Sequence, residues 1–240
     1  MPILVTVVLS TFIPVLAATL AGVVATIWPP RARVTSAVQH FAAGVVFAAA
    51  AIELLPELLR HSPVATILGF ALGIVVMFGL RWATERLEQP ASRGVVSLIA
   101  ATGVDFLVDG LVLGAGFAAG GQTGSLLTVA VTIEYLFVGI SIAAAMGAQA
   151  SRWRTIGVPF GLALLTTVGA AVGVVMLQVV PGDVLATVLA FGAVAFMYLV
   201  TEELLVKAHE QGETAGGSAL FFIGFLLYLV IEEVAGTWSS

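Results

Sequence analysis

Apolar residues fill most of this chain in long runs, and short polar stretches separate the runs. Within a run the apolar residues do not alternate with polar ones, which is typical of spanning helices rather than barrel strands. A hydropathy window of about nineteen residues therefore predicts a series of membrane helices. The eight predicted helices cover 3–27, 35–59, 63–83, 94–119, 124–148, 156–180, 184–207 and 218–236. The pattern indicates an all-α integral membrane protein.

The breaks between the runs are rich in proline, glycine, serine and charged residues, which favour loops. They read WPPRAR, RHSP, ERLEQPASR, GGQTG, ASRWR, PGD and HEQGETAGG. None is long enough to separate soluble domains, so 1–240 is expected to be a single membrane domain. The first run lacks a positively charged start and is too long for a signal-peptide core, so we interpret it as a retained span.

Composition agrees with this interpretation. Of the 240 residues, 60% are hydrophobic and 10% are charged, whereas soluble domains have about 45–50% and about 25%. The chain contains no cysteine, which excludes disulfides and thiolate metal ligands within it. No basic patch suggests a nucleic-acid partner. We expect a multi-pass protein of the cell membrane whose main surroundings are lipid.

The cationic residues predict an orientation. They are Arg31, Arg33, Arg60, Arg81, Arg86, Arg93, Arg152, Arg154 and Lys207. If the N-terminus lies outside, all of them except Arg60 fall at cytoplasmic ends, which is 9 − 1 = 8 of the nine. Cytoplasmic ends of membrane helices carry an excess of lysine and arginine. The sequence therefore predicts eight transmembrane helices with both termini outside.

Three carboxylates lie at mid-depth on consecutive predicted helices. Asp105 is eleven residues beyond Gly94, or about 17 Å along the helix at ~1.5 Å per residue. Asp109 lies one turn further on the same face, and Glu134 is at a similar depth in the next helix. A charged group there costs between ~3 and ~15 kcal/mol. Protonated or hydrogen-bonded interhelical pairs are the alternative, but three acids at one level favour a metal-cation site.

Several stretches carry a family resemblance. Residues 105–110 read DFLVDG, residues 134–139 read EYLFVG, residues 53–57 read ELLPE, and Glu203 lies in GAVAFMYLVTEELLVKAHE. These stretches resemble motifs of the fourth, fifth, second and seventh helices of the ZIP family of zinc/iron permeases. The family's fourth-helix motif is H-N-x-P-E-G, and its second-helix motif resembles H-L-L-P-E. The resemblance implies eight helices, external termini and transport of a divalent metal.

The chain departs from the family pattern within the site. Asp105 replaces the motif histidine, Phe106 the asparagine and Asp109 the glutamate, while Val138 takes the last acidic position of the fifth-helix motif. Both motif prolines are missing, and the nearest polar residue on the sixth helix is Thr166. These departures from the family pattern predict at most one site of three carboxylates, instead of the family's binuclear arrangement. Tyr135, Thr166, Ser141 or water are candidates to complete it.

Oxygen ligands suit hard or borderline cations such as Mn²⁺, Mg²⁺ and Fe²⁺. The loss of imidazole weakens the case for Zn²⁺, although zinc also accepts carboxylates. We therefore expect a divalent zinc, iron or manganese ion as the transported substrate, with no cofactor bound. Competition of protons for the ligand carboxylates would aid release of the ion.

Further polar residues are candidates for the ends of a pathway. Glu53 and Glu57, near the outer end of the second helix, are a candidate entrance, and solvated interface residues are the alternative. Glu203 and His209, near the inner end of the seventh helix, are a candidate exit or metal-sensing patch; a solvated helix end is the alternative. We interpret His40 as a packing or interface residue.

The main hypothesis is a divalent metal transporter that works by alternating access around the midplane carboxylates. One alternative is a ZIP-like scaffold or regulatory protein that no longer transports, and another is a cation or proton channel. An enzyme is not expected, because the three histidines do not have the H-E-x-x-H spacing of membrane metalloproteases. A homodimer is left open.

Overall fold

The computed structural model describes residues 3–28, 31–87, 94–146, 151–210 and 215–239. None of these residues lies in a strand, and eight helical spans are long and apolar enough to cross a membrane. The prediction of an all-α, multi-pass membrane protein is thus confirmed. Exposed leucine, isoleucine, valine and phenylalanine side chains cover the outside of the helices, as expected where lipid is the solvent.

Six of the spans are single helices, and the second and seventh are each built from three segments. The single helices are α1 (Ile3–Ile27), α4 (Pro63–Leu87), α5 (Gly94–Ala119), α6 (Gly121–Met146), α7 (Arg152–Leu177) and α10 (Ala215–Ser239). The second span consists of α2 (Ala32–Ala49), the π-helix η1 (Ala50–Leu54) and α3 (Leu55–Leu58). The seventh consists of α8 (Gly182–Tyr198), the π-helix η2 (Leu199–Leu204) and α9 (Leu205–Glu210).

The connection between the fourth and fifth spans differs from the prediction. GGQTG was expected to be a loop, but α5 ends at Ala119 and α6 begins at Gly121, so that Gly120 alone connects them. Helical hydrogen bonding continues on both sides, because the Gly120 N–H donates to the Gly116 carbonyl at 2.9 Å and the Gly124 N–H to the Gly120 carbonyl at 3.0 Å. The end of the predicted helix 124–148 lies outside the described residues.

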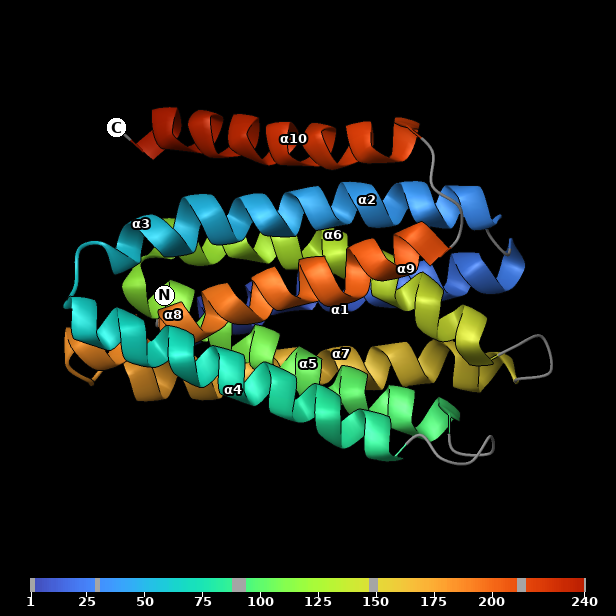
Figure 1. Cartoon of the computed structure of the whole chain (residues 1–240), viewed down its shortest axis with the longest axis horizontal. Helices are drawn as coiled ribbons and strands as arrows, with labels where there is room; N and C mark the ends of the chain where they lie inside the picture. The colour runs from blue at the N-terminus through green and yellow to red at the C-terminus, as the bar shows by residue number, and fades with distance from the viewer. Residues whose placement is uncertain (1–2, 29–30, 88–93, 147–150, 211–214, 240) are drawn as a thin grey trace.

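The helices run roughly along one direction, and the two termini lie at the same end of the bundle (Figure 1). The short connections at 59–62, 120 and 178–181 lie at this terminal end, and α9 ends at the opposite end (Figure 1). Helix α10 packs mainly along α2, at one edge, and α4 packs along α8 (Figure 1). The buried core is formed mostly by residues of α2, α5, α6 and α8.

The two ends of the chain form an inverted repeat. The second span begins at Ala32 and the seventh at Gly182, which is 182 − 32 = 150 residues later. Their π-helices end at Leu54 and Leu204, which are also 204 − 54 = 150 residues apart. The two spans run in opposite directions (Figure 1). Helix pairing follows the same rule, because α1 packs on α6 as α7 packs on α5, and α10 packs on α2 as α4 packs on α8.

The central helices α5 and α6 are equivalent in this repeat. Residues 108–119 read VDGLVLGAGFAA and residues 133–144 read IEYLFVGISIAA, with an acid, a leucine, a glycine and two alanines at matching positions. A Cβ on Gly114 would overlap backbone atoms of α7, and one on Gly139 would overlap backbone atoms of α1. Glycine at both positions therefore allows close helix contact, and it fixes the depth of Asp109 and Glu134.

Candidate metal centre

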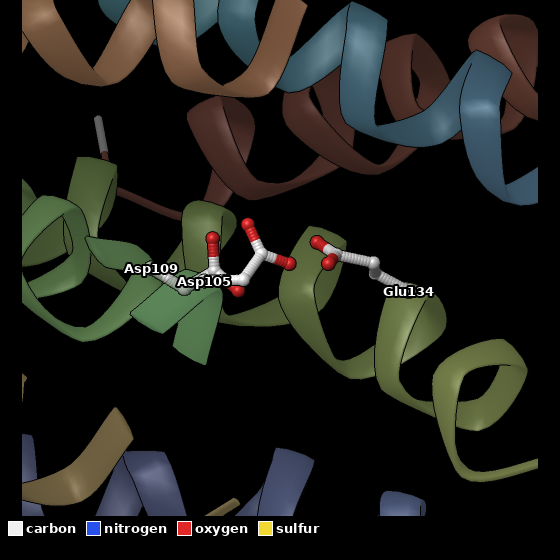
Figure 2. Close-up of side chains that lie close together, drawn as sticks. All are labelled: Asp105, Asp109 and Glu134. Atoms are coloured by element: carbon white, nitrogen blue, oxygen red, sulfur yellow. The ribbon is translucent and has the colours of Figure 1, made fainter. Parts of the chain in front are cut away.

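Asp105 and Asp109 lie near the middle of α5, and Glu134 lies near the middle of α6. The three carboxylates point toward one another across the gap between the two helices (Figure 2). Each contributes an oxygen, and these oxygens all lie within 4.8 Å of one another. The structure thus brings together the three residues that the sequence indicated as metal ligands.

The side chains of this triad are largely buried inside the bundle. Glu134 is 0% exposed, Asp109 is 1% exposed and Asp105 is half-buried. Both oxygens of Glu134 are buried without a hydrogen-bond partner among the described residues. Buried polar atoms normally have partners, because an unpaired one costs several kcal/mol. A divalent cation held by the three carboxylates would supply the missing partner.

Tyr135 and Thr166 complete the polar surroundings of Asp109. The Tyr135 hydroxyl donates to Oδ2 of Asp109 at 3.1 Å and also hydrogen-bonds the Thr166 hydroxyl. Phe106 stacks on the Tyr135 ring with 4.0 Å between centroids, so this residue supports the tyrosine rather than offering a ligand. Among the described residues, the atoms of the triad, Tyr135 and Thr166 that could bind a metal are all oxygens, which suits hard or borderline divalent cations.

A cavity of about 70 Å³ lies between Asp105 and the part of the bundle where η2 and α9 meet. Its lining includes Asp105, Ser141, Glu203 and Lys207, from α5, α6, η2 and α9. This volume has room for a few water molecules. Lys207 Nζ lies 3.1 Å from a carboxylate oxygen of Glu203. Glu203, expected at an exit, therefore lines the same cavity as Asp105 of the triad, and Ser141 lines it too.

The other predicted pathway residues lie elsewhere. His209 does not line this cavity, and its ring packs against that of His40, with 5.3 Å between centroids. Glu57 lies 3.2 Å from Arg60 in an ion pair at the terminal end. Glu53, in η1, is 9% exposed, which contradicts the alternative of a solvated residue, and its role at an entrance stays a prediction.

Two features of the site were missed in the sequence. The first is the ion pair of Lys207 with Glu203, although their spacing of four residues on a helix is a signal for such pairs. The second is the neighbour of His40: this side chain is 1% exposed, as its interpretation as a packing residue expects, and its ring lies against that of His209. It faces α9, a contact between distant parts of the chain that no local pattern indicates.

No protein-family model matches the chain, and no curated protein matches it either. A fold alone does not determine function, so the chemistry of the carboxylate triad has to indicate it.

Proposed function

We propose that this protein is a divalent metal transporter of the cell membrane and a divergent member of the ZIP family. Its substrate is a zinc, iron or manganese ion, bound by Asp105, Asp109 and Glu134. The observation that carries the proposal is the convergence of these carboxylates in the middle of a helical bundle, where no described residue donates a hydrogen bond to either Glu134 oxygen. Ionisable groups at membrane depth generally mark ion pathways.

The inverted repeat supports alternating access as the mechanism. Transporters built from inverted repeats bind substrate near the midplane, at the interface of the repeats, and expose it alternately to the two sides. Asp109 and Glu134 occupy equivalent positions of the two central helices, so the ion would sit between the repeats. The cavity from Asp105 to Lys207 would be the open half of the pathway.

The distribution of charge supports an orientation. Arg31, Arg33, Arg81, Arg154 and Lys207 lie on elements at the end opposite the termini, whereas Arg60 lies at the terminal end. By the positive-inside rule the opposite end is cytoplasmic. Both termini then face outward, and the cavity is open to the cytoplasm.

Uptake of Mn²⁺, Fe²⁺ and Zn²⁺ into proteoliposomes containing the purified protein tests the proposal. We expect Asp109→Asn and Glu134→Gln to reduce uptake at least tenfold, because each removes an anionic ligand. Glu233→Gln is the matched control, since Glu233 is an exposed carboxylate of α10. Unchanged uptake in the double variant Asp105→Ala, Glu134→Ala would refute the site. A wild type that neither transports nor is stabilised by any of these ions would favour the scaffold alternative.

A further inference from the structure

A groove of about 220 Å³ opens between α4 and the seventh span. Its lining consists of Phe70, Ile74 and Phe78 from α4 and of Val194, Met197, Tyr198, Thr201 and Glu202 from the seventh span. None of these residues lines the cavity beside Asp105. This feature, which we call the α4–α8 groove, is therefore separate from the carboxylate triad.

The groove lies where the two spans move apart along their length. Near the terminal end α4 packs closely on α8, because a Cβ on Gly69 would overlap the Thr187 carbonyl and one on Gly73 would overlap the Val194 side chain. The two spans diverge toward the end of the bundle where α9 lies (Figure 1). The groove occupies the space between them.

The lining of the groove is mostly apolar and belongs to the outer surface of the bundle. Ile74 and Phe78 are exposed, and the Phe78 ring meets the Tyr198 ring edge to face, with 5.4 Å between centroids. In a bilayer this surface faces the acyl chains of lipids, and an apolar groove does not retain water. An acyl chain is therefore the group that fits it.

One end of the groove carries two charges. Glu202 lines this end and forms an ion pair with Arg81 of α4, and the two side chains are 33% and 44% exposed. Arg81 follows Pro63 by 81 − 63 = 18 residues, or about 27 Å along the helix, close to the ~30 Å thickness of the hydrocarbon core. Trp82 beside it is exposed, as is typical at headgroup depth. The ion pair thus lies at the level of lipid headgroups.

We propose that the α4–α8 groove binds a phospholipid with a primary-amine headgroup, such as phosphatidylethanolamine. Its acyl chain lies between α4 and α8, its phosphate accepts hydrogen bonds from Arg81, and its ammonium donates to Glu202. A purely anionic headgroup offers the Glu202 carboxylate no cation. The quaternary ammonium of phosphatidylcholine has no N–H to donate. The pair of opposite charges therefore matches a headgroup that carries both signs and can donate.

A bound lipid would lie against the π-helix η2. Glu202 and Glu203 are consecutive residues of this segment, and Glu202 lines the groove whereas Glu203 lines the cavity beside Asp105. The groove and the cavity thus share one segment of the chain, and a lipid in the groove would restrict its movement. Lipid binding here does not require the carboxylate triad to be a transport site.

Native mass spectrometry of the purified full-length protein tests the headgroup assignment. Phosphatidylethanolamine, phosphatidylcholine and phosphatidylglycerol with identical acyl chains are added in turn to the detergent solution, and we expect the first to be retained best. Arg81→Gln and Glu202→Gln should each weaken this preference by about 2- to 5-fold, the range for partly exposed charge pairs. Arg60→Gln, which removes the exposed partner of Glu57 at the opposite end of the bundle, is the matched control and should keep the preference.

Ile74→Trp tests the acyl-chain part of the site, because the larger side chain would fill the groove. We expect it to bind one phosphatidylethanolamine fewer than wild type. Val75→Trp, at an exposed position that does not line the groove, should bind as wild type does. Lipid-free thermal unfolding and size-exclusion profiles check that both variants are folded.

Three results would overturn the lipid site. The first is equal retention of the three lipids by the wild type. The second is a preference that stays unchanged in both Arg81→Gln and Glu202→Gln. The third is the loss of a dimer, with unchanged lipid binding, in Ile74→Trp, which would assign the groove to contact with a second copy of the chain.

Discussion

At the scale of single residues, the hydrogen bonds around Asp109 show how a carboxylate is oriented inside a membrane bundle. Tyr135 reaches it from α6 and is itself bound to Thr166 of α7, so three helices contribute to its position. Glu134 has no comparable donor in the part of the chain that the structure describes. This difference suggests separate roles, with Asp109 fixed in advance and Glu134 adjusting to the ion.

The substitution Tyr135→Phe tests the role of this hydroxyl. It removes the donor to Asp109 while keeping the ring stacked on Phe106, so the fold should change by only about 1 kcal/mol in free energy of unfolding. Metal affinity should fall about 10-fold or more, as for other partners that orient ligands. Metal-dependent thermal shifts measure both effects. Tyr198→Phe, on a half-buried tyrosine away from the triad, is the control; equal affinity in both variants would remove Tyr135 from the site.

The sequence indicated the triad because spacing and depth along a helix can be counted without knowing the fold. Asp105 and Asp109 lie one turn apart, and Glu134 lies at the same depth of the following helix. The contact between the rings of His40 and His209 could not be predicted in this way. His40 and His209 are 169 residues apart (209 − 40 = 169), and only the packing of α2 against α9 brings them together.

At the scale of elements, the two π-helices interrupt equivalent spans and carry acidic residues. Such segments are rare, and they are frequent at functional sites. In η1 the π-turn directs Glu53 into the protein, and in η2 it places Glu203 on the cavity. Lys207 follows Glu203 by one turn and brings a positive charge into the same space.

Neutralising Lys207 and neutralising Glu203 should change the affinity for the metal ion in opposite directions. Lys207→Gln removes a cation that repels the metal ion in the cavity, so affinity should increase by a few-fold, while Glu203→Gln should decrease it by a similar amount. Titration of the metal-dependent thermal shift at low and high salt measures both, and screening should reduce each effect. A shift of the same sign in both variants would show that the pair acts through structure instead of charge.

Close packing of α5 on α7 depends on the absence of a side chain at Gly110. A Cβ there would overlap the backbone carbonyl of Thr166, which cannot rotate away. We expect Gly110→Ala to destabilise the protein by about 1–3 kcal/mol and to weaken metal binding through the adjacent Asp109. Unfolding in mixed micelles measures the first effect. Gly157→Ala, where nothing lies within 4 Å of the added Cβ, should change stability by at most about 1 kcal/mol.

At the scale of the whole molecule, the bilayer sets span length and the packing sets the symmetry. The eight spans were predictable because each needs about twenty apolar residues. The inverted repeat could not be predicted, because its two halves resemble each other in which residues are buried and in how the helices pair, and less in residue identity. Glu53-Leu54-Leu55 and Glu203-Leu204-Leu205 are one of the few matches at the shift of 150 residues.

The orientation proposed from the charges can be measured directly, because the chain has no cysteine of its own. Ser62→Cys places a thiol at the terminal end, and Ser151→Cys places one at the opposite end. A membrane-impermeant maleimide should label the first in intact cells and the second only after permeabilisation, because the arginine-rich end stays in the cytoplasm. Thr102→Cys, on the cavity, should react from the cytoplasmic side and be protected by the transported ion. The reverse labelling pattern would invert the topology, and the cavity would then be the outward-facing half of the pathway.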